Sequence, residues 1–353
     1  MDIKVTRASK LKAKPSGGDL PFGVHYSDHM FILDYDEDKG WHDARIEPYA
    51  PLTLDPAAMC LHYAQAVFEG LKAYRGADKK IRLFRADANA RRMDASHERL
   101  CIPRLPETAF LEAVEAIVRF ESDWVPSEPG TSLYIRPYTF ATEPHLGVRP
   151  SKTYKFMIIL SPVGSYYPEG INPIKILIED EYVRAVRGGV GFVKAAANYA
   201  ISLKGQEKAL GLGYTQTLWL DGVKREYIEE IGTTNAFFKI DGELVTPELS
   251  GSILPGITRD TIITLAGSWG LPVSQRPLTV AEVYDASAEG KLEEAFASGT
   301  AAVISPVSEF NWAGRVITVS NGETGKTARK LYNEITGMQY GDIEDKFGWV
   351  RTL

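Results

Sequence analysis

Two hydrophobic patterns alternate along the first half of the chain. Short runs rich in aromatic and β-branched residues predict β-strands at 30–35, 81–84, 132–140 and 154–160. Between the second and third runs, apolar residues recur at helical spacing and predict an amphipathic helix with one core-facing stripe, formed by Phe110, Leu111, Val114, Ile117, Val118 and Trp124. Core packing accounts for this stripe, so we assign it no chemistry.

The second half of the chain shows a similar alternation. Two strands and an intervening helix are predicted there, at 174–178, 217–220 and about 198–210. Two further apolar runs, 236–240 and 243–246, flank Asp241-Gly242, a dipeptide that favours a two-residue turn with positive φ. These two runs therefore predict a β-hairpin.

A stretch dense in proline, glycine and tyrosine separates the two halves at 161–170. Such a composition is typical of an interdomain linker. We expect a tail, a first domain, a linker and a second domain, at 1–20, 21–163, 164–172 and 173–353. The N-terminal segment is basic, almost free of acid and without a hydrophobic signal core, so we expect a frayed tail; a short organellar presequence is the alternative.

Composition and charge narrow the classes of function. The chain has 353 residues, of which 44% are hydrophobic and 24% charged, enough for two domains with sizeable cores. Its formal charge of −6, from 40 basic and 46 acidic residues, argues against a general nucleic-acid binder. No apolar run is long enough to span a bilayer. We therefore expect small-molecule substrates, and neither nucleic acid nor a membrane as partner.

The cysteine content indicates a reducing compartment. Cys60 and Cys101 cannot form a disulfide framework, and the sequence has no N-x-[ST] glycosylation site. We expect a cytoplasmic protein.

One lysine stands alone in a stretch of small and apolar residues, GGVGFVKAAANY at 188–199. An ammonium group in apolar surroundings loses hydration, which favours the neutral, nucleophilic amine and allows a Schiff base. Tyr199, five positions after Lys194, is a candidate hydrogen-bond donor, and the small residues leave room for a flat ring. By itself the pattern also fits a strand-end lysine that extends to water, and GGVG fits a tight turn.

Two other patterns resemble known sites but do not fit them. The GKT at 325–327 lacks the glycine that a phosphate-binding loop requires five residues earlier, because Ser320 stands there. His25 and His29 are four residues apart, but their segment does not read as the helix that a metal pair at this spacing needs. We predict neither a nucleoside triphosphate site nor a metal site.

Two segments, 254–258 and 298–302, have features of anion sites. LPGIT opens a predicted helix, whose first N–H groups and dipole suit a phosphate, and SGTAA offers hydroxyls and close backbone donors. A strand-end turn is the alternative for each. The acidic pair Glu229-Glu230 lies among apolar residues. A carboxylate there needs a cationic partner, either a protonated heterocycle or the basic side chain of a structural ion pair.

Together these segments show a family resemblance. Over 21–353 the chain resembles the branched-chain amino acid aminotransferases, fold-type IV enzymes that use pyridoxal 5'-phosphate (PLP). The family implies a mixed α/β (α+β) fold with a smaller N-terminal α/β domain and a larger C-terminal, PLP-binding pseudo-barrel domain. The motifs that carry the resemblance are YSDHMF, LHYAQAVFEGLKAY, IRLFRADANARRM, GTSLYIRPY, GGVGFVKAAANY, EEIGTTNAF, ILPGITR and ASGTAAVISPV.

The resemblance also implies an activity and a cofactor site. The expected reaction exchanges an amino group between L-leucine, L-isoleucine or L-valine and 2-oxoglutarate by a ping-pong mechanism on PLP. Lys194 would be the Schiff-base lysine and would move a proton between substrate Cα and cofactor C4′, while Glu230 would keep the ring nitrogen protonated. Tyr199 would donate to the phenolic oxygen, and Arg92, preferred to Arg91, would bind the phosphate. The cofactor-binding set is then Lys194, Arg92, Tyr199, Glu230, Thr234, Ile257, Thr258 and Thr300.

The substrate side follows from the same resemblance. A branched side chain is expected in an apolar pocket lined by Phe22, Tyr63, Phe68 and Tyr134. Carboxylates are expected at Arg136 and at donors from Thr233, Thr234, Ala301 and Ala302. A loop from the second subunit of a homodimer is expected to complete the pocket, with Leu146 and Val148.

One position departs from part of the family. Animal members carry a CxxC thiol switch just after the GTA turn, whereas this chain has Ala302 and Ser305 there. We therefore expect no redox regulation by that route.

Two rival functions share parts of the pattern. A D-amino acid aminotransferase or an aminodeoxychorismate lyase of the same fold has the lysine, the glutamate and the phosphate site, but is typically shorter and lacks SLYIRPY and FEGLKAY. A non-enzymatic binding protein is disfavoured because Lys194, Glu230 and Tyr199 are all present.

Overall fold

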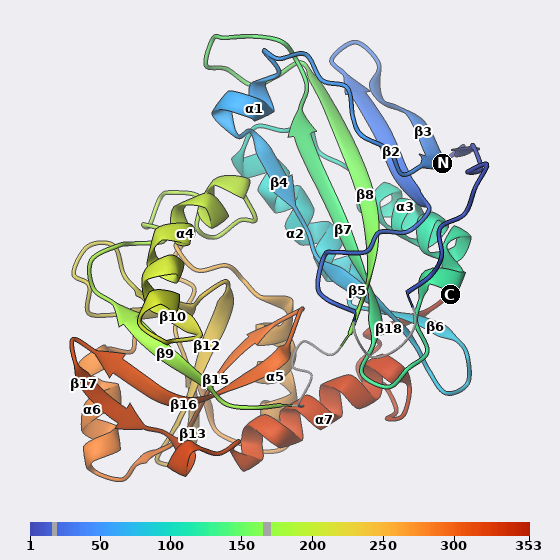
Figure 1. The fold of residues 1–353 in the computed structure, drawn as a ribbon. Helices are drawn as coiled ribbons and strands as arrows, with labels where there is room; N and C mark the ends of the chain where they lie inside the picture. The colour runs from blue at the N-terminus through green and yellow to red at the C-terminus, as the bar shows by residue number, and fades with distance from the viewer. Residues whose placement is uncertain (16–19, 165–170) are drawn as a thin grey trace. The chain divides into compact units, whose positions relative to one another are not determined.

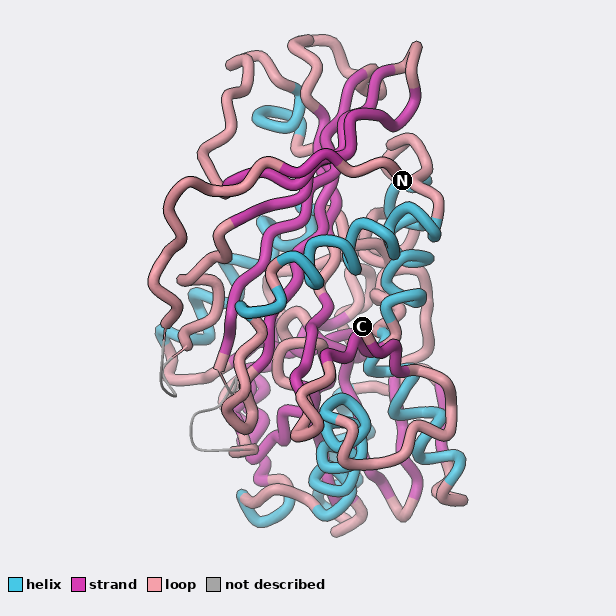
Figure 2. Tube along the Cα trace, turned by 90° about the vertical axis from the view of Figure 1, so that its right-hand side faces the viewer, coloured by secondary structure: helices cyan, strands magenta, loops and turns pink. Residues whose placement is uncertain are grey.

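The computed structural model describes residues 1–15, 20–164 and 171–353, which form two compact units (Figure 1). Of the described residues, the first unit holds 1–15, 20–164, 194–196 and 337–353, and the second holds 171–193 and 197–336. Both units combine helices and strands (Figure 2). Most of the expected linker, 165–170, lies outside the described residues. In the described ranges, no helix combines the length and the apolar character needed to cross a membrane.

A nine-stranded, mainly antiparallel sheet organises the first unit. Its order is β1-β3-β2-β8-β7-β5-β6-β18, and β4 pairs with β7 outside this path. The four strands predicted from hydrophobic runs are confirmed as β2, β6, β7 and β8. The bounds are β1 (Lys4–Val5), β2 (His29–Asp36), β3 (Gly40–Pro48), β4 (Ala66–Phe68), β5 (Leu71–Arg75), β6 (Ile81–Phe84), β7 (Ser132–Ala141), β8 (Thr153–Val163) and β18 (Val350–Thr352).

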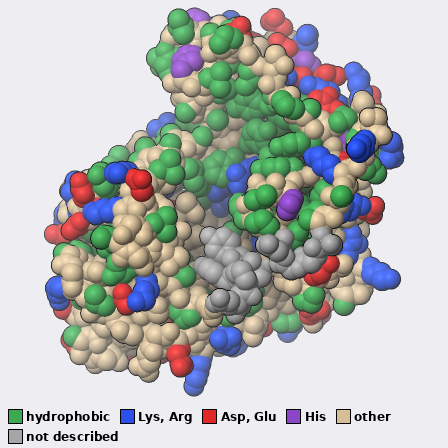
Figure 3. All heavy atoms as spheres, viewed as in Figure 1, with side chains coloured by type: hydrophobic (Ala, Val, Ile, Leu, Met, Phe, Trp, Pro, Cys, Tyr) green, Lys and Arg blue, Asp and Glu red, His purple; other side chains and the backbone are tan. Residues whose placement is uncertain are grey.

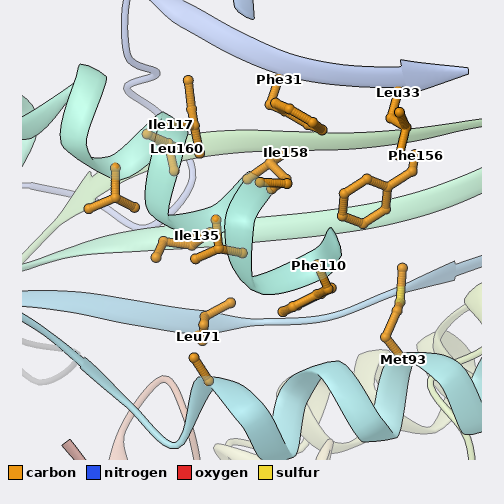
Figure 4. Packing of buried hydrophobic residues seen from close by; sticks show 14 of the residues in the cluster. Phe31, Leu33, Leu71, Met93, Phe110, Ile117, Ile135, Phe156, Ile158 and Leu160 are labelled. Carbon is orange, nitrogen blue, oxygen red and sulfur yellow. The ribbon is translucent and has the colours of Figure 1, made fainter. Parts of the chain in front are cut away.

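Helices α1 (Met59–Tyr63), α2 (Ala86–Arg99) and α3 (Glu107–Phe120) belong to the same unit. Phe110 and Ile117 of α3 are buried against β8 residues such as Phe156 (Figure 4). This confirms the predicted amphipathic helix, which ends at Phe120. Trp124 lies in a separate 3-10 turn, η1 (Ser122–Trp124), and its indole N–H donates to Asp28 Oδ2 at 2.8 Å.

The expectation of a frayed N-terminal tail is wrong for residues 1–15. β1 pairs in parallel with β3, which gives the segment a place in the sheet. The amide of Ala8 donates to His29 Nε2 at 2.8 Å, and the amide of Lys12 donates to Asp28 Oδ1 at 2.7 Å. These buried polar side chains satisfy the backbone of the segment, and neither can be recognised as its partner from the sequence.

The C-terminal segment also differs from the expected domain assignment. Residues 337–353, expected in the second domain, lie in the first unit, because β18 pairs with β6 and Arg351 forms an ion pair with Glu115. A short middle segment, 194–196, also belongs to the first unit, where Ala195 makes a β-bridge with Val67.

The second unit contains a closed ring of strands. Its nine-stranded sheet has the order β11-β10-β9-β16-β15-β12-β13-β14, with β17 paired to β16. Because β11 also pairs with β12, the six strands from β11 to β12 close on themselves, and the expected pseudo-barrel is confirmed. The bounds are β9 (Ile174–Glu179), β10 (Gln216–Leu220), β11 (Ile228–Ile231), β12 (Thr234–Ile240), β13 (Glu243–Thr246), β14 (Val273–Gln275), β15 (Leu292–Gly299), β16 (Val303–Trp312) and β17 (Arg315–Thr318).

Helices and turns around this ring complete the second unit. The predicted hairpin is confirmed as β12 and β13, with positive φ at Asp241 and Gly242. The predicted helix after the lysine stretch is also confirmed. The bounds are α4 (Ala196–Gly211), α5 (Ile257–Ser268), α6 (Val280–Ala288), η2 (Ser320–Gly322) and α7 (Lys326–Tyr340), the last residues of which belong to the first unit.

Candidate active site

Lys194 lies in the loop between β9 and α4, and its backbone is tied to the first unit. Its N–H donates to Ser96 Oγ at 3.1 Å, and its C=O accepts from the Phe68 N–H at 3.1 Å. The side chain is half-buried, with Nζ 4.7 Å from the centre of the Phe68 ring. The lysine is therefore held at both backbone groups while its amine faces an aromatic ring.

A fully buried carboxylate lies close to this lysine. Glu69 binds Arg92 in a bidentate pair, with Nε 2.7 Å from Oε1 and Nη2 2.9 Å from Oε2, and it accepts from Asn89 Nδ2 at 2.7 Å. Burial opposes ionisation of Glu69, but the charges of Arg92 and Lys194 outweigh it and hold the pKa of the carboxyl below its usual value. The first unit therefore holds two cations next to one buried carboxylate.

The structure separates the two adjacent arginines of α2. Arg92 has a side chain 9% exposed and faces Glu69, whereas the Arg91 side chain is 56% exposed and pairs with Asp87 at the surface. This difference favours Arg92 as the arginine of the site.

Aromatic rings surround Arg136 on β7. Its guanidinium lies 4.6 Å from the Phe68 ring centre and 5.1 Å from that of Tyr134, and Nη2 donates to the Tyr134 hydroxyl at 2.9 Å. Phe22 contacts Tyr134 edge to face at 4.8 Å. A Cβ at Gly70 would overlap the Tyr134 hydroxyl, so any larger residue there would displace this ring. Four of the expected substrate residues are thus brought together.

The other expected pocket residues of the first unit form a separate exposed group. The Tyr63 hydroxyl of α1 donates to the Leu146 carbonyl oxygen. Leu146 and Val148 are 75% and 86% exposed. Figure 3 shows hydrophobic side chains gathered over this part of the unit.

In the second unit, Glu230 is buried at the wall of a pocket lined also by Tyr199, Thr233 and Leu254. Glu230 Oε1 accepts from the Leu254 N–H at 2.8 Å and lies 3.4 Å from Arg184 Nη2. A backbone donor and an arginine therefore hold the carboxylate in place.

The two predicted anion segments both pack against β12. Asn235 donates to the Leu254 carbonyl at 2.9 Å, and a Cβ at Gly256 would overlap Asn235 Oδ1, so a larger residue there would displace this amide. α5 then begins at Ile257 without a side-chain cap. In the other segment, a Cβ at Gly299 would lie 2.8 Å from Thr234 Cγ2. Thr258 and Thr300 to Ala302 follow directly in these segments.

The comparisons with known proteins give the family. The family model described as amino-transferase class IV matches residues 66–310. Branched-chain-amino-acid aminotransferase 2 of Bacillus subtilis (strain 168) is 55% identical over 98% of this chain and 96% of its own length. The branched-chain-amino-acid aminotransferase of Mycobacterium tuberculosis (strain CDC 1551 / Oshkosh) is 47% identical over 94% of this chain and 92% of its own. The chain belongs to the branched-chain-amino-acid aminotransferases of class IV.

Solved aminotransferase structures share the fold. One structure of the Escherichia coli branched-chain amino acid aminotransferase gives a TM-score of 0.76 at 27% identity, and the match covers 92% of this chain and 98% of that chain. The T.th. branched-chain amino acid aminotransferase with pyridoxamine 5'-phosphate gives 0.75 at 26% identity, over 91% and 97%. The family resemblance found in the sequence is confirmed.

Sequence reasoning missed two polar residues of this aminotransferase, Glu69 and Arg184. Glu69 lies between Phe68 and Gly70 in an apolar run, and the argument applied to Glu230, that an acid among apolar residues needs a cation, could have found it. The sequence does not single out Arg184 in this way, because most arginines lie at the surface and nothing in the sequence around Arg184 predicts its burial. In the structure it is 6% exposed and faces Glu230.

Proposed function

We propose that this aminotransferase exchanges amino groups between L-leucine, L-isoleucine or L-valine and 2-oxoglutarate, using PLP in a ping-pong mechanism. Its full-length relatives named for branched-chain amino acids support this proposal over a D-amino acid aminotransferase or a lyase of the same fold. Two further solved structures of the T.th. enzyme, each 25% identical to this chain, contain N-(5'-phosphopyridoxyl)-L-glutamate and 4-methylvaleric acid. These ligands represent the two classes of substrate proposed here.

The residues of the chain fit a PLP phosphate. α5 begins without a side-chain cap, and its N-terminal dipole favours an anion. The buried Ser298 hydroxyl, beside the 299–302 turn, has no hydrogen-bond partner within the described ranges. The family resemblance implies that Ile257, Thr258 and Thr300 would hold the phosphate, together with Arg92.

The ring and the reacting amine would be held by three other groups. When bound, PLP supplies an electron sink for the charge that develops at substrate Cα. Lys194 would hold the cofactor covalently and move the proton at substrate Cα. Glu230 would keep the ring nitrogen protonated, and Tyr199, which lines the same pocket, would donate to the phenolic oxygen.

Substrate carboxylates would be met by Arg136 and by donors from Thr233, Thr234, Ala301 and Ala302. Arg136 Nε is buried and lacks a hydrogen-bond partner in the described part of the chain, so a donor is available to a carboxylate. The rings of Phe22, Phe68 and Tyr134 would contact a branched side chain.

The observation that carries the proposal is the position of Lys194, held through both backbone groups beside Phe68 and the Glu69–Arg92 pair. The test is the visible absorption spectrum of the purified protein. We expect a chromophore that L-leucine bleaches and 4-methyl-2-oxopentanoate restores, and borohydride should fix it on Lys194. A colourless protein that gains no chromophore with added PLP would refute the proposal.

We also propose a cytoplasmic homodimer. Leu146 and Val148 are exposed apolar residues, which suits a loop that contacts the pocket of a partner subunit, with Tyr63 beside it. Both cysteines are free thiols, consistent with a reducing compartment. Light scattering should give twice the chain mass, and replacement of Leu146 and Val148 by serine should lower activity.

A further inference from the structure

A second carboxyl group is buried next to Glu230 and has no part in the function proposed above. Glu229 and Glu230 are consecutive in β11 and are 5% and 3% exposed. Glu229 Oε1 accepts from the Ser252 hydroxyl, and Oε2 has no hydrogen-bond partner among the residues described. Burying a half-satisfied carboxyl group is unfavourable, so its position calls for an explanation.

One short loop connects the two carboxyl groups. The Leu254 N–H binds Glu230 at 2.8 Å, and the Ser252 hydroxyl binds Glu229. The Ser252 carbonyl accepts from Arg184 Nη2, which also lies 3.4 Å from Glu230 Oε1. The loop therefore holds both acids and their arginine in one polar network.

The charges around Glu229 oppose each other. Burial is the largest influence and raises the pKa of this carboxyl to about 7, with the charges of Glu230 and Asp221 acting in the same direction. The Ser252 hydroxyl and Arg184 favour the ionised form. Glu229 thus exchanges its proton near neutral pH, and a change of charge at Glu230 would shift that exchange.

We propose that Glu229 is a positioning residue that releases a proton when a cationic ring nitrogen binds at Glu230. This inference rests on the proposed function. A cation at Glu230 offsets the negative charge that opposes ionisation of Glu229, so the Glu229 proton passes to solvent and no covalent bond other than O–H changes. The ionised Glu229 then attracts the Arg184 guanidinium more strongly. Arg184 competes less for Glu230, and the Glu230 carboxylate can pair with the ring nitrogen.

The experiment measures proton release when pyridoxamine 5'-phosphate binds to the apo-protein, because this probe binds without a covalent bond to lysine. Calorimetry in buffers of different ionisation enthalpy, from pH 6 to 8.5, gives the proton count. The matched variants are Glu229→Gln and, as a control, Glu248→Gln at an exposed carboxyl of the same unit.

With a pKa of about 7, the wild type should release about half a proton more than Glu229→Gln at pH 7. Its affinity should also rise with pH, by up to about tenfold per unit below pH 7, and level off above it. Glu229→Gln should lose this rise, and Glu248→Gln should match the wild type.

Ser252→Ala provides a second test that does not need Glu229→Gln to fold. Loss of the hydroxyl donor removes an influence that favours the ionised carboxyl, so proton release should shift to higher pH. Equal proton counts in wild type and Glu229→Gln, or an unshifted profile in Ser252→Ala, would overturn the inference. Failure of the wild type to bind the probe at all would instead refute the proposed function, and this inference with it.

Discussion

Replacing Arg136 by glutamine should separate the two classes of substrate. In the structure this guanidinium lies against the rings of Phe68 and Tyr134 and donates one hydrogen bond to the Tyr134 hydroxyl. Its buried Nε has no partner in the described residues. A pocket that accepts both leucine and glutamate needs a polar group among its rings, and we propose that Arg136 binds the γ-carboxylate of 2-oxoglutarate.

The expected size of the effect follows from the kind of contact. A hydrogen bond to a charged group contributes about 1.5–3 kcal/mol, so its loss corresponds to about a 10- to 150-fold change in rate or affinity. Glutamine keeps a polar end but loses the charge. The 2-oxoglutarate half-reaction should therefore slow by about that factor, whereas 4-methyl-2-oxopentanoate, which has no second carboxylate, should be much less affected.

Single-turnover rates of the amine form with each keto acid provide the assay. Tyr134→Phe is the matched control, because it removes the hydroxyl that Arg136 contacts and leaves the charge in place. Equal losses for the two keto acids in Arg136→Gln would refute the reasoning. They would mean that Arg136 binds the α-carboxylate common to all substrates or only supports β7.

Three further predictions test the site. Lys194→Ala should abolish transamination while the protein still folds, because a small residue enters a stretch of small residues and Arg92 remains paired with Glu69; retained turnover would contradict the assignment. Gly70→Ala should raise KM for the keto acids, because its Cβ would displace the Tyr134 hydroxyl; an unchanged KM would contradict the packing argument. Mild peroxide followed by dithiothreitol should leave activity nearly unchanged. Burial raises the pKa of the Cys60 thiol and keeps it protonated, whereas Cys101 is exposed and has no assigned role in the site. Large reversible inactivation would implicate Cys60.

The local elements of the fold could be predicted because each depends on a short stretch of sequence. Apolar runs gave β2, β6, β7 and β8, and the Asp241-Gly242 turn gave the hairpin of β12 and β13. The pairing of distant strands could not be predicted in this way. The pattern of β18, for example, does not indicate that it returns to β6, more than 260 residues earlier, because any edge strand offers the same backbone groups.

In the candidate site, too, the sequence indicates which residues need a partner but not which distant residue provides it. An acid in an apolar run requires a cation, and this rule finds Glu230 directly and could have found Glu69. The rule does not identify the cation, because 40 basic residues compete for the role. Folding pairs Glu69 with Arg92 of α2 and places Arg184, from a loop, beside Glu230. Removing one member of such a buried pair leaves an uncompensated charge, at a typical cost of about 3–5 kcal/mol. Replacing either arginine should therefore lower the stability of the fold as well as the activity. A loss of activity in an Arg92 or Arg184 variant must be compared with the change in its unfolding free energy before it is assigned to the reaction.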